Sequence, residues 1–82
     1  MENRIAILAV IVENPESTEQ LNNLLHTYRS GIIGRMGLPC KERGISLISV
    51  AMDAPQSEIS ALSGKIGRLQ GVTVKTAYAS AG

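Results

Sequence analysis

The stretch from Ile59 to Lys75 constrains the fold of this chain most, because it joins a helix, a stop and a strand in one short run. Its apolar residues recur at spacings of three and four, which is the pattern of one face of an α-helix. They are Ile59, Leu62, Ile66 and Leu69. Gly71 is expected to stop the helix sharply, and Val72–Tyr78 is expected to form a strand.

A second stripe on the same helix consists of small residues and lies about a quarter turn from the apolar one. Its members are Ser60, Ser63, Gly64 and Gly67. A glycine inside a helix costs about 1 kcal/mol relative to alanine, so close approach of another backbone or of a ligand is expected to offset that cost. The alternative is that one glycine only relieves crowding against the domain's own sheet. We therefore take Ser63, Gly64, Lys65 and Gly67 as candidate ligand contacts.

The other elements follow from hydrophobic runs and their breaks. In chain order they are a central strand at Arg4–Val12, a helix with the apolar face Leu21, Leu24, Leu25 and Tyr28, a bulged or edge strand at Ile32–Leu38, and a second central strand at Ile45–Met52. The order βαββαβ predicts a single α+β domain over residues 1–82. Right-handed crossovers give a ferredoxin-like sandwich, with a four-stranded antiparallel sheet ordered 4-1-3-2 and both helices on one face.

Side-chain alternation predicts which strand residues face the helices and which face away. Those expected to face the helices are Val72, Val74, Ile48, Val50 and Met52. Those expected to point outward are Thr73, Lys75, Ser49, Ala51, Leu47 and Arg35. This outer face is too apolar at its centre for comfortable solvation, so we expect a second copy of the chain to cover it, in a dimer or a tetramer.

Charge and cysteine content narrow the function classes. Eight basic and seven acidic residues give a formal net charge of +1, which argues against direct binding of nucleic acid. One cysteine excludes an internal disulfide and suits a reducing cytoplasm. The apolar run Ile5–Val12 is too short to span a membrane, and no small-residue cleavage site follows it, so neither an anchor nor a signal peptide is expected.

The sequence contains no catalytic pattern, and its glycine motifs fit known sites poorly. Gly64-Lys65 lacks the glycine and hydroxyl residues of a phosphate-binding loop, because Ile59 and Ile66 stand at those positions. The GxxG clamp of a KH domain needs a helix on each side, whereas one helical pattern runs through these glycines. We therefore expect no enzymatic activity.

Two cations on the predicted outer face form a candidate anion site. Arg35 lies between Gly34 and Gly37, and Lys75 is expected on the opposite edge strand with the same orientation. Guanidinium and ammonium groups over small residues can hold an anion, or can pair with acidic residues of a partner subunit.

Four separated blocks of the chain resemble the iron-only hydrogenase system regulator family. The blocks are Leu24–His26, Ile32–Pro39, Ile59–Gly67 and Gly71–Thr76. The resemblance implies an ACT-like version of the ferredoxin-like fold, similar to the C-terminal domain of the nickel-responsive repressor, and homo-oligomers. The family often has an aromatic residue at the position of Cys40. The loop Val12–Pro15 lacks the glycine that ACT amino-acid sensors usually carry there.

Together these features predict a small, cytoplasmic, self-associating regulatory domain that binds a small ligand or a partner protein. No DNA-binding segment of its own is evident, and no cofactor is predicted. The alternative is a metal-responsive module with sites shared between subunits, built from His26 or Cys40, since one histidine and one cysteine cannot form a metal site within one chain.

Overall fold

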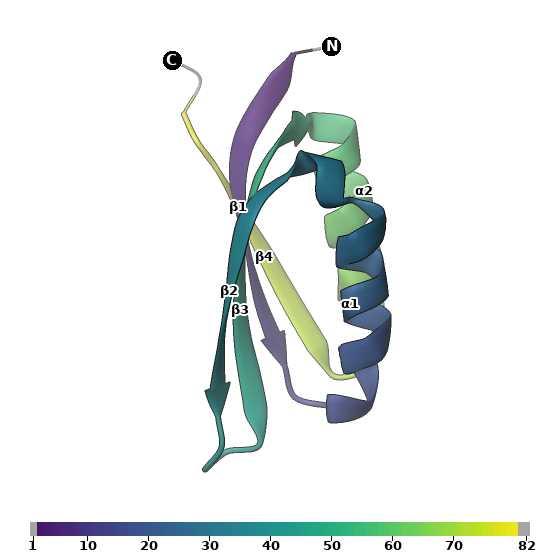
Figure 1. The fold of residues 1–82 in the computed structure, drawn as a ribbon, viewed down its shortest axis with the longest axis vertical. Helices are drawn as coiled ribbons and strands as arrows, with labels where there is room; N and C mark the ends of the chain where they lie inside the picture. Colours follow the sequence, from purple (N-terminus) through teal and green to yellow (C-terminus); the bar gives the residue numbers. More distant parts are fainter. Residues whose placement is uncertain (1, 81–82) are drawn as a thin grey trace.

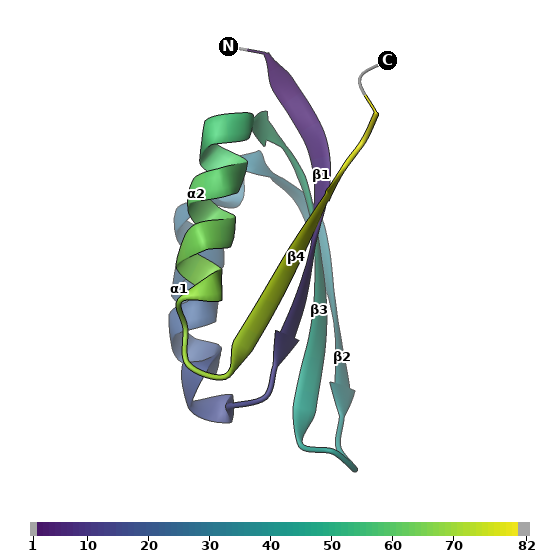
Figure 2. The same cartoon turned by 180° about the vertical axis from the view of Figure 1, so that it is seen from behind.

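The computed structural model describes residues 2–80 as an antiparallel sheet with two helices on one face (Figures 1 and 2). Its elements are β1 (Asn3–Val12), α1 (Thr18–Thr27), β2 (Ile32–Cys40), β3 (Ile45–Pro55), α2 (Gln56–Gly67) and β4 (Val72–Tyr78), with 3-10 turns at Pro15–Ser17 and Arg29–Gly31. The strand order is β2-β3-β1-β4. This is the predicted order 4-1-3-2 counted from the other edge, so the ferredoxin-like sandwich is confirmed. Within residues 2–80, none of the helices combines the length and the apolar character that crossing a membrane requires.

The core lies between the helices and one face of the sheet. Its buried members are Ala6, Leu8, Val10 and Val12 from β1, Val50, Met52 and Ala54 from β3, Leu21 and Leu25 from α1, and Ile59, Leu62 and Ile66 from α2. Alternate residues of β1 point the other way, and Ile5 and Ile7 are 46% and 48% exposed. The strand order confirms that β1 is a central strand. In the single chain, however, only one of its two faces is buried.

The two loops at one end of the fold are tied together. Gly71 has a φ of 70°, a left-handed conformation that suits glycine. A Cβ on Gly71 would lie 2.6 Å from the Cβ of Asn14, so this turn packs directly on the loop after β1. The main-chain N–H of Glu13 donates to the Gly71 carbonyl at 2.7 Å, and the hydroxyl of Ser17 donates to the Gln70 carbonyl at 2.6 Å. The helix α2 ends at Gly67, before the stop predicted at Gly71, and it is the turn at Gly71 that closes this end of the domain.

A β-bulge changes which side of the sheet Arg35 faces. The pairing of β2 with β3 shifts register between Ile32 and Gly34, and beyond the shift Arg35 pairs with Val50. Val50 is fully buried beneath the helices, so Arg35 lies on the helix side of the sheet. The outward orientation predicted for Arg35 is therefore wrong. The bulge itself was expected, but the inserted residue also inverts the alternation of all that follows it.

Candidate functional site

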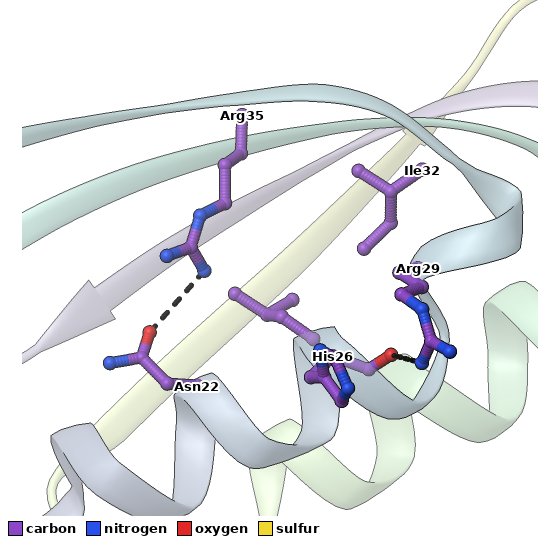
Figure 3. A pocket seen from close by; sticks show the side chains of 6 residues that line it. Asn22, His26, Arg29, Ile32 and Arg35 are labelled. Carbon is purple, nitrogen blue, oxygen red and sulfur yellow. Dashed lines mark hydrogen bonds between the residues drawn. The ribbon is translucent and has the colours of Figure 1, made fainter.

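A pocket of about 390 Å³ opens between α1 and the edge strand β2 (Figure 3). It is lined by Asn22, Leu25 and His26 from α1, by Arg29 from the turn after α1, and by Ile32 and Arg35 from β2. Its volume lies in the range of small-molecule pockets, about 300–1,000 Å³. Two arginines and a histidine are thus gathered around one cavity, and among residues 2–80 no carboxylate belongs to its lining.

Each pocket arginine makes one hydrogen bond to a neutral acceptor. Arg35 Nη1 donates to Asn22 Oδ1 at 3.3 Å, and Arg29 Nη1 donates to the main-chain carbonyl of His26 at 2.9 Å (Figure 3). A guanidinium group has five N–H donors, so both side chains keep donors beyond these bonds. The arrangement can therefore bind an anion without first breaking an ion pair.

The floor of the pocket is apolar. Leu25 is only 3% exposed, and Ile32 is half-buried against the core. Small-molecule sites usually combine such an apolar lining with a few placed polar groups. The pocket can thus receive a ligand that has both an anionic group and a hydrocarbon part.

The helix-free face of the sheet is the second notable surface. Large aliphatic side chains stand exposed on three of its strands: Ile5, Ile7, Ile11, Met36, Leu38 and Leu47, each between 39% and 60% exposed. Leu38 pairs with Leu47, and Leu47 pairs with Ile11, so one row of the patch crosses β2, β3 and β1 without a break. A shallow hollow of about 300 Å³ lies over this row.

The small-residue stripe of α2 faces the chain's own sheet in part. Ser63 Oγ and Thr76 Oγ1 are 3.2 Å apart and hydrogen-bonded. A Cβ on Gly67 would lie 3.3 Å from Val74 Cγ1, closer than most side-chain contacts. The alternative that one glycine relieves crowding against the sheet therefore describes Gly67. It does not describe Gly64, whose Cβ position meets only the end of the Arg68 side chain, at 3.9 Å.

Lys65 is held by a contact within the domain. Its Nζ donates to the Tyr28 hydroxyl at 2.9 Å and lies 5.2 Å from the centre of that ring. The pair joins α2 to the end of α1. A structural role for Lys65 thus has direct support, whereas its role as a ligand contact stays a prediction.

The residues predicted as candidate ligand contacts are spread over three places. Gly34 and Lys75 lie on the helix-free face, Arg35 and Gly37 on the helix side of β2, and Ser63, Gly64, Lys65 and Gly67 on α2. The predicted pairing of Arg35 with Lys75 over one anion is wrong, because the sheet separates them. Sequence reasoning missed Arg29 and Asn22 as the neighbours of Arg35. The bulge at Gly34 was the sequence signal that could have revealed them. A bulge changes the side of the sheet that the following residues face, and that change places Arg35 next to α1.

The two residues considered for metal binding lie on different elements. His26 lines the α1–β2 pocket, and Cys40 is a half-buried free thiol at the end of β2. In the part of the chain that the structure describes, no group of three or more His, Cys, Asp or Glu side chains could hold a metal ion. Sites shared between subunits remain a prediction, since a single chain does not test them.

Comparison with solved structures agrees with this fold. The uncharacterized protein TM1266 from Thermotoga maritima superposes with a TM-score of 0.90 at 36% identity, over 94% of this chain and 98% of that one. The C-terminal domain of the MgtC protein from Mycobacterium tuberculosis superposes with a TM-score of 0.70 at 14% identity, over 94% of this chain and 88% of that one. At that identity the second likeness shows the fold alone.

Sequence comparison identifies the family. No curated protein matches the chain. Residues 4–76 match the model of the TM1266-like family, described as "Iron-only hydrogenase system regulator, putative". The match spans nearly the whole chain and agrees with the four sequence blocks and the TM1266 superposition. The chain therefore belongs to this TM1266-like family.

Proposed function

We propose that this protein is a small cytoplasmic regulatory module of an iron-only hydrogenase system, which self-associates through its helix-free sheet face and binds a small ligand or a partner protein. The description of its family as a regulator supports binding rather than catalysis. The unpaired thiol of Cys40 suits a reducing compartment. The observation that carries the proposal is the exposed aliphatic patch.

The patch is contiguous, unlike the single exposed apolar residues that are common on monomers. Soluble monomers rarely expose contiguous apolar areas above a few hundred Å². Full burial of an aliphatic side chain stabilises by about 1.5–3 kcal/mol, so covering several half-exposed ones yields a substantial driving force. Met36, Leu38, Leu47 and Ile11 supply that driving force at the centre of the face.

A second copy of the chain is the occupant we favour. The face is built from the strands of one sheet, and a two-fold axis would place the same aliphatic row of each copy against that of the other. Lys75 and Asp53 both lie on this face, through their pairing with Ala9 and Ile5 of β1. One cation and one carboxylate leave the face without net charge, so two copies meet without strong repulsion.

The proposal is tested by measuring the mass of the assembly in solution, for the wild-type chain and for variants that carry one added charge. Light scattering on the wild-type chain should give a dimer or a tetramer of the 8.7 kDa protomer at micromolar concentration. Leu47→Lys should dissociate it, because an unpaired buried ammonium costs several kcal/mol. Ala61→Lys adds the same charge at an exposed position of α2 and should leave the assembly intact. A monomeric wild-type protein would refute the proposal.

The regulatory part is tested in cells. In a host that has an iron-only hydrogenase, deletion of this protein should change hydrogenase activity or abundance. The Ala61→Lys form should restore the normal level, and the Leu47→Lys form should not. No change on deletion would contradict a regulatory role, whatever the oligomeric state.

A further inference from the structure

The α1–β2 pocket combines two arginines with an apolar floor. Only some of the N–H donors of these arginines form hydrogen bonds within the domain. We propose that this pocket binds a short aliphatic dicarboxylate, with one carboxylate on Arg29, the other on Arg35, and the hydrocarbon segment over Leu25 and Ile32. The inference rests on the proposed function, for which it supplies the small ligand.

The bulge in β2 is the first support, because it aims Arg35 into the pocket. If β2 alternated regularly from Ile32 without a bulge, the Arg35 side chain would lie on the helix-free face among the aliphatic patch. Bulges occur often beside functional sites, where they redirect a side chain. Within the described residues, the Arg35 side chain makes one hydrogen bond, to the Asn22 amide at 3.3 Å. Arg35 remains exposed, so a ligand from solvent can reach its guanidinium group.

The unused donors are the second support. A guanidinium presents its N–H groups in a planar fork that matches the two oxygens of a carboxylate. Arg29 engages one Nη with the carbonyl of His26, at the end of α1 where a cation also suits the helix dipole. This structural bond leaves the rest of its fork for a ligand. The amide of Asn22 and the ring of His26 add further polar groups to the lining.

The lining as a whole selects the ligand shape. Figure 3 shows Arg35 directed toward Asn22 and Arg29 bonded to the main-chain carbonyl of His26, so the two guanidinium groups are bonded to different residues of α1. A compact anion such as phosphate would leave the apolar floor uncovered. A short chain with a carboxylate at each end could meet both guanidinium groups and cover the apolar floor. Burial of that hydrocarbon segment would add about 0.8 kcal/mol per methylene group.

Titration calorimetry and amide NMR shifts on the full chain provide the test. Succinate and glutarate are the probes, with butyrate and inorganic phosphate as single-headed controls at equal ionic strength. At least one dicarboxylate should bind saturably below about 10 mM and shift the amides of Asn22, Arg29 and Arg35. Butyrate and phosphate should bind at least about tenfold more weakly, since each loses one charged contact. Equal affinity for a dicarboxylate and for butyrate or phosphate, or no saturable dicarboxylate binding, would overturn the proposal.

Charge-matched variants localise the site. Arg35→Gln and Arg29→Gln should each weaken dicarboxylate binding about tenfold or more. Arg43→Gln, in the distant turn between β2 and β3, removes the same charge and should change it less than about twofold. Arg35→Lys keeps the charge and edge-strand structure but loses the fork, so it should also weaken binding. Equal effects of Arg43→Gln and Arg35→Gln would mean nonspecific attraction and refute the site.

Failure here is separable from failure of the proposed function, because the pocket and the aliphatic patch lie on opposite faces of the sheet. Arg35→Gln should therefore leave the light-scattering mass unchanged. Leu47→Lys should leave the dicarboxylate-induced NMR shifts in place.

Discussion

Substituting the two glycines of α2 by alanine should stabilise the protein at Gly64 and should not stabilise it at Gly67. Gly64 lies inside the helix, and an added Cβ meets only the flexible end of Arg68 at 3.9 Å. Gly67 is the last helical residue, and its added Cβ would lie 3.3 Å from Val74 Cγ1. The two variants add the same methyl group three residues apart, so they serve as controls for each other.

The magnitudes follow from helix propensity and packing. At Gly64, alanine should stabilise by about 0.4–1 kcal/mol through propensity and a less disordered unfolded chain. For a domain of this size that corresponds to a melting temperature higher by about 2–8 °C. At Gly67, the propensity gain is smaller because the residue ends the helix. Overpacking of Val74 should cost about 1 kcal/mol or more, so the net change is neutral or destabilising.

Urea unfolding followed by circular dichroism measures both changes, at one fixed protein concentration because association raises apparent stability. A double-mutant cycle with Val74→Ala isolates the contact. In that background Gly67→Ala should lose its penalty, with a coupling energy of about 0.5 kcal/mol or more. If Gly67→Ala stabilises as much as Gly64→Ala, the contact of the added methyl group with Val74 does not change the free energy of unfolding. If Gly64→Ala destabilises, a second chain or a ligand packs on that position, and the open side of α2 is an interface.

Two further substitutions test the tied end of the domain. Gly71→Ala should destabilise by more than about 1–3 kcal/mol, because a left-handed φ strains alanine and its Cβ would overlap Asn14 at 2.6 Å. An unchanged melting temperature would show that the loop relaxes freely. Ser17→Ala should cost about 1 kcal/mol in urea unfolding, because it removes the 2.6 Å bond from a buried hydroxyl to the Gln70 carbonyl, whereas Ser60→Ala at an exposed position of α2 should not destabilise.

The sequence by itself determined the elements and their order. Helical spacing gave α2 its buried face of Ile59, Leu62 and Ile66, and β-branched runs located β1 and β3. These signals are local, because a helix or a strand must match its own period to a core. With six elements in the order βαββαβ, right-handed crossovers leave few arrangements of the sheet, which is why the strand order could also be predicted.

The candidate site could not be predicted because it depends on register. One inserted residue at the bulge moves Arg35 from the aliphatic face to the helix side, and the sequence shows the glycines but not the pairing that results. The neighbours that it meets there, Asn22 and Arg29, come from α1 and from the turn after it, whose distance from β2 only packing sets. In the same way, helix propensity assigns a glycine a similar free-energy cost in any helix. Whether Gly67 is needed to leave space for the sheet depends on where Val74 lies. Local periodicity determined which elements form, and tertiary packing decided which side chains meet.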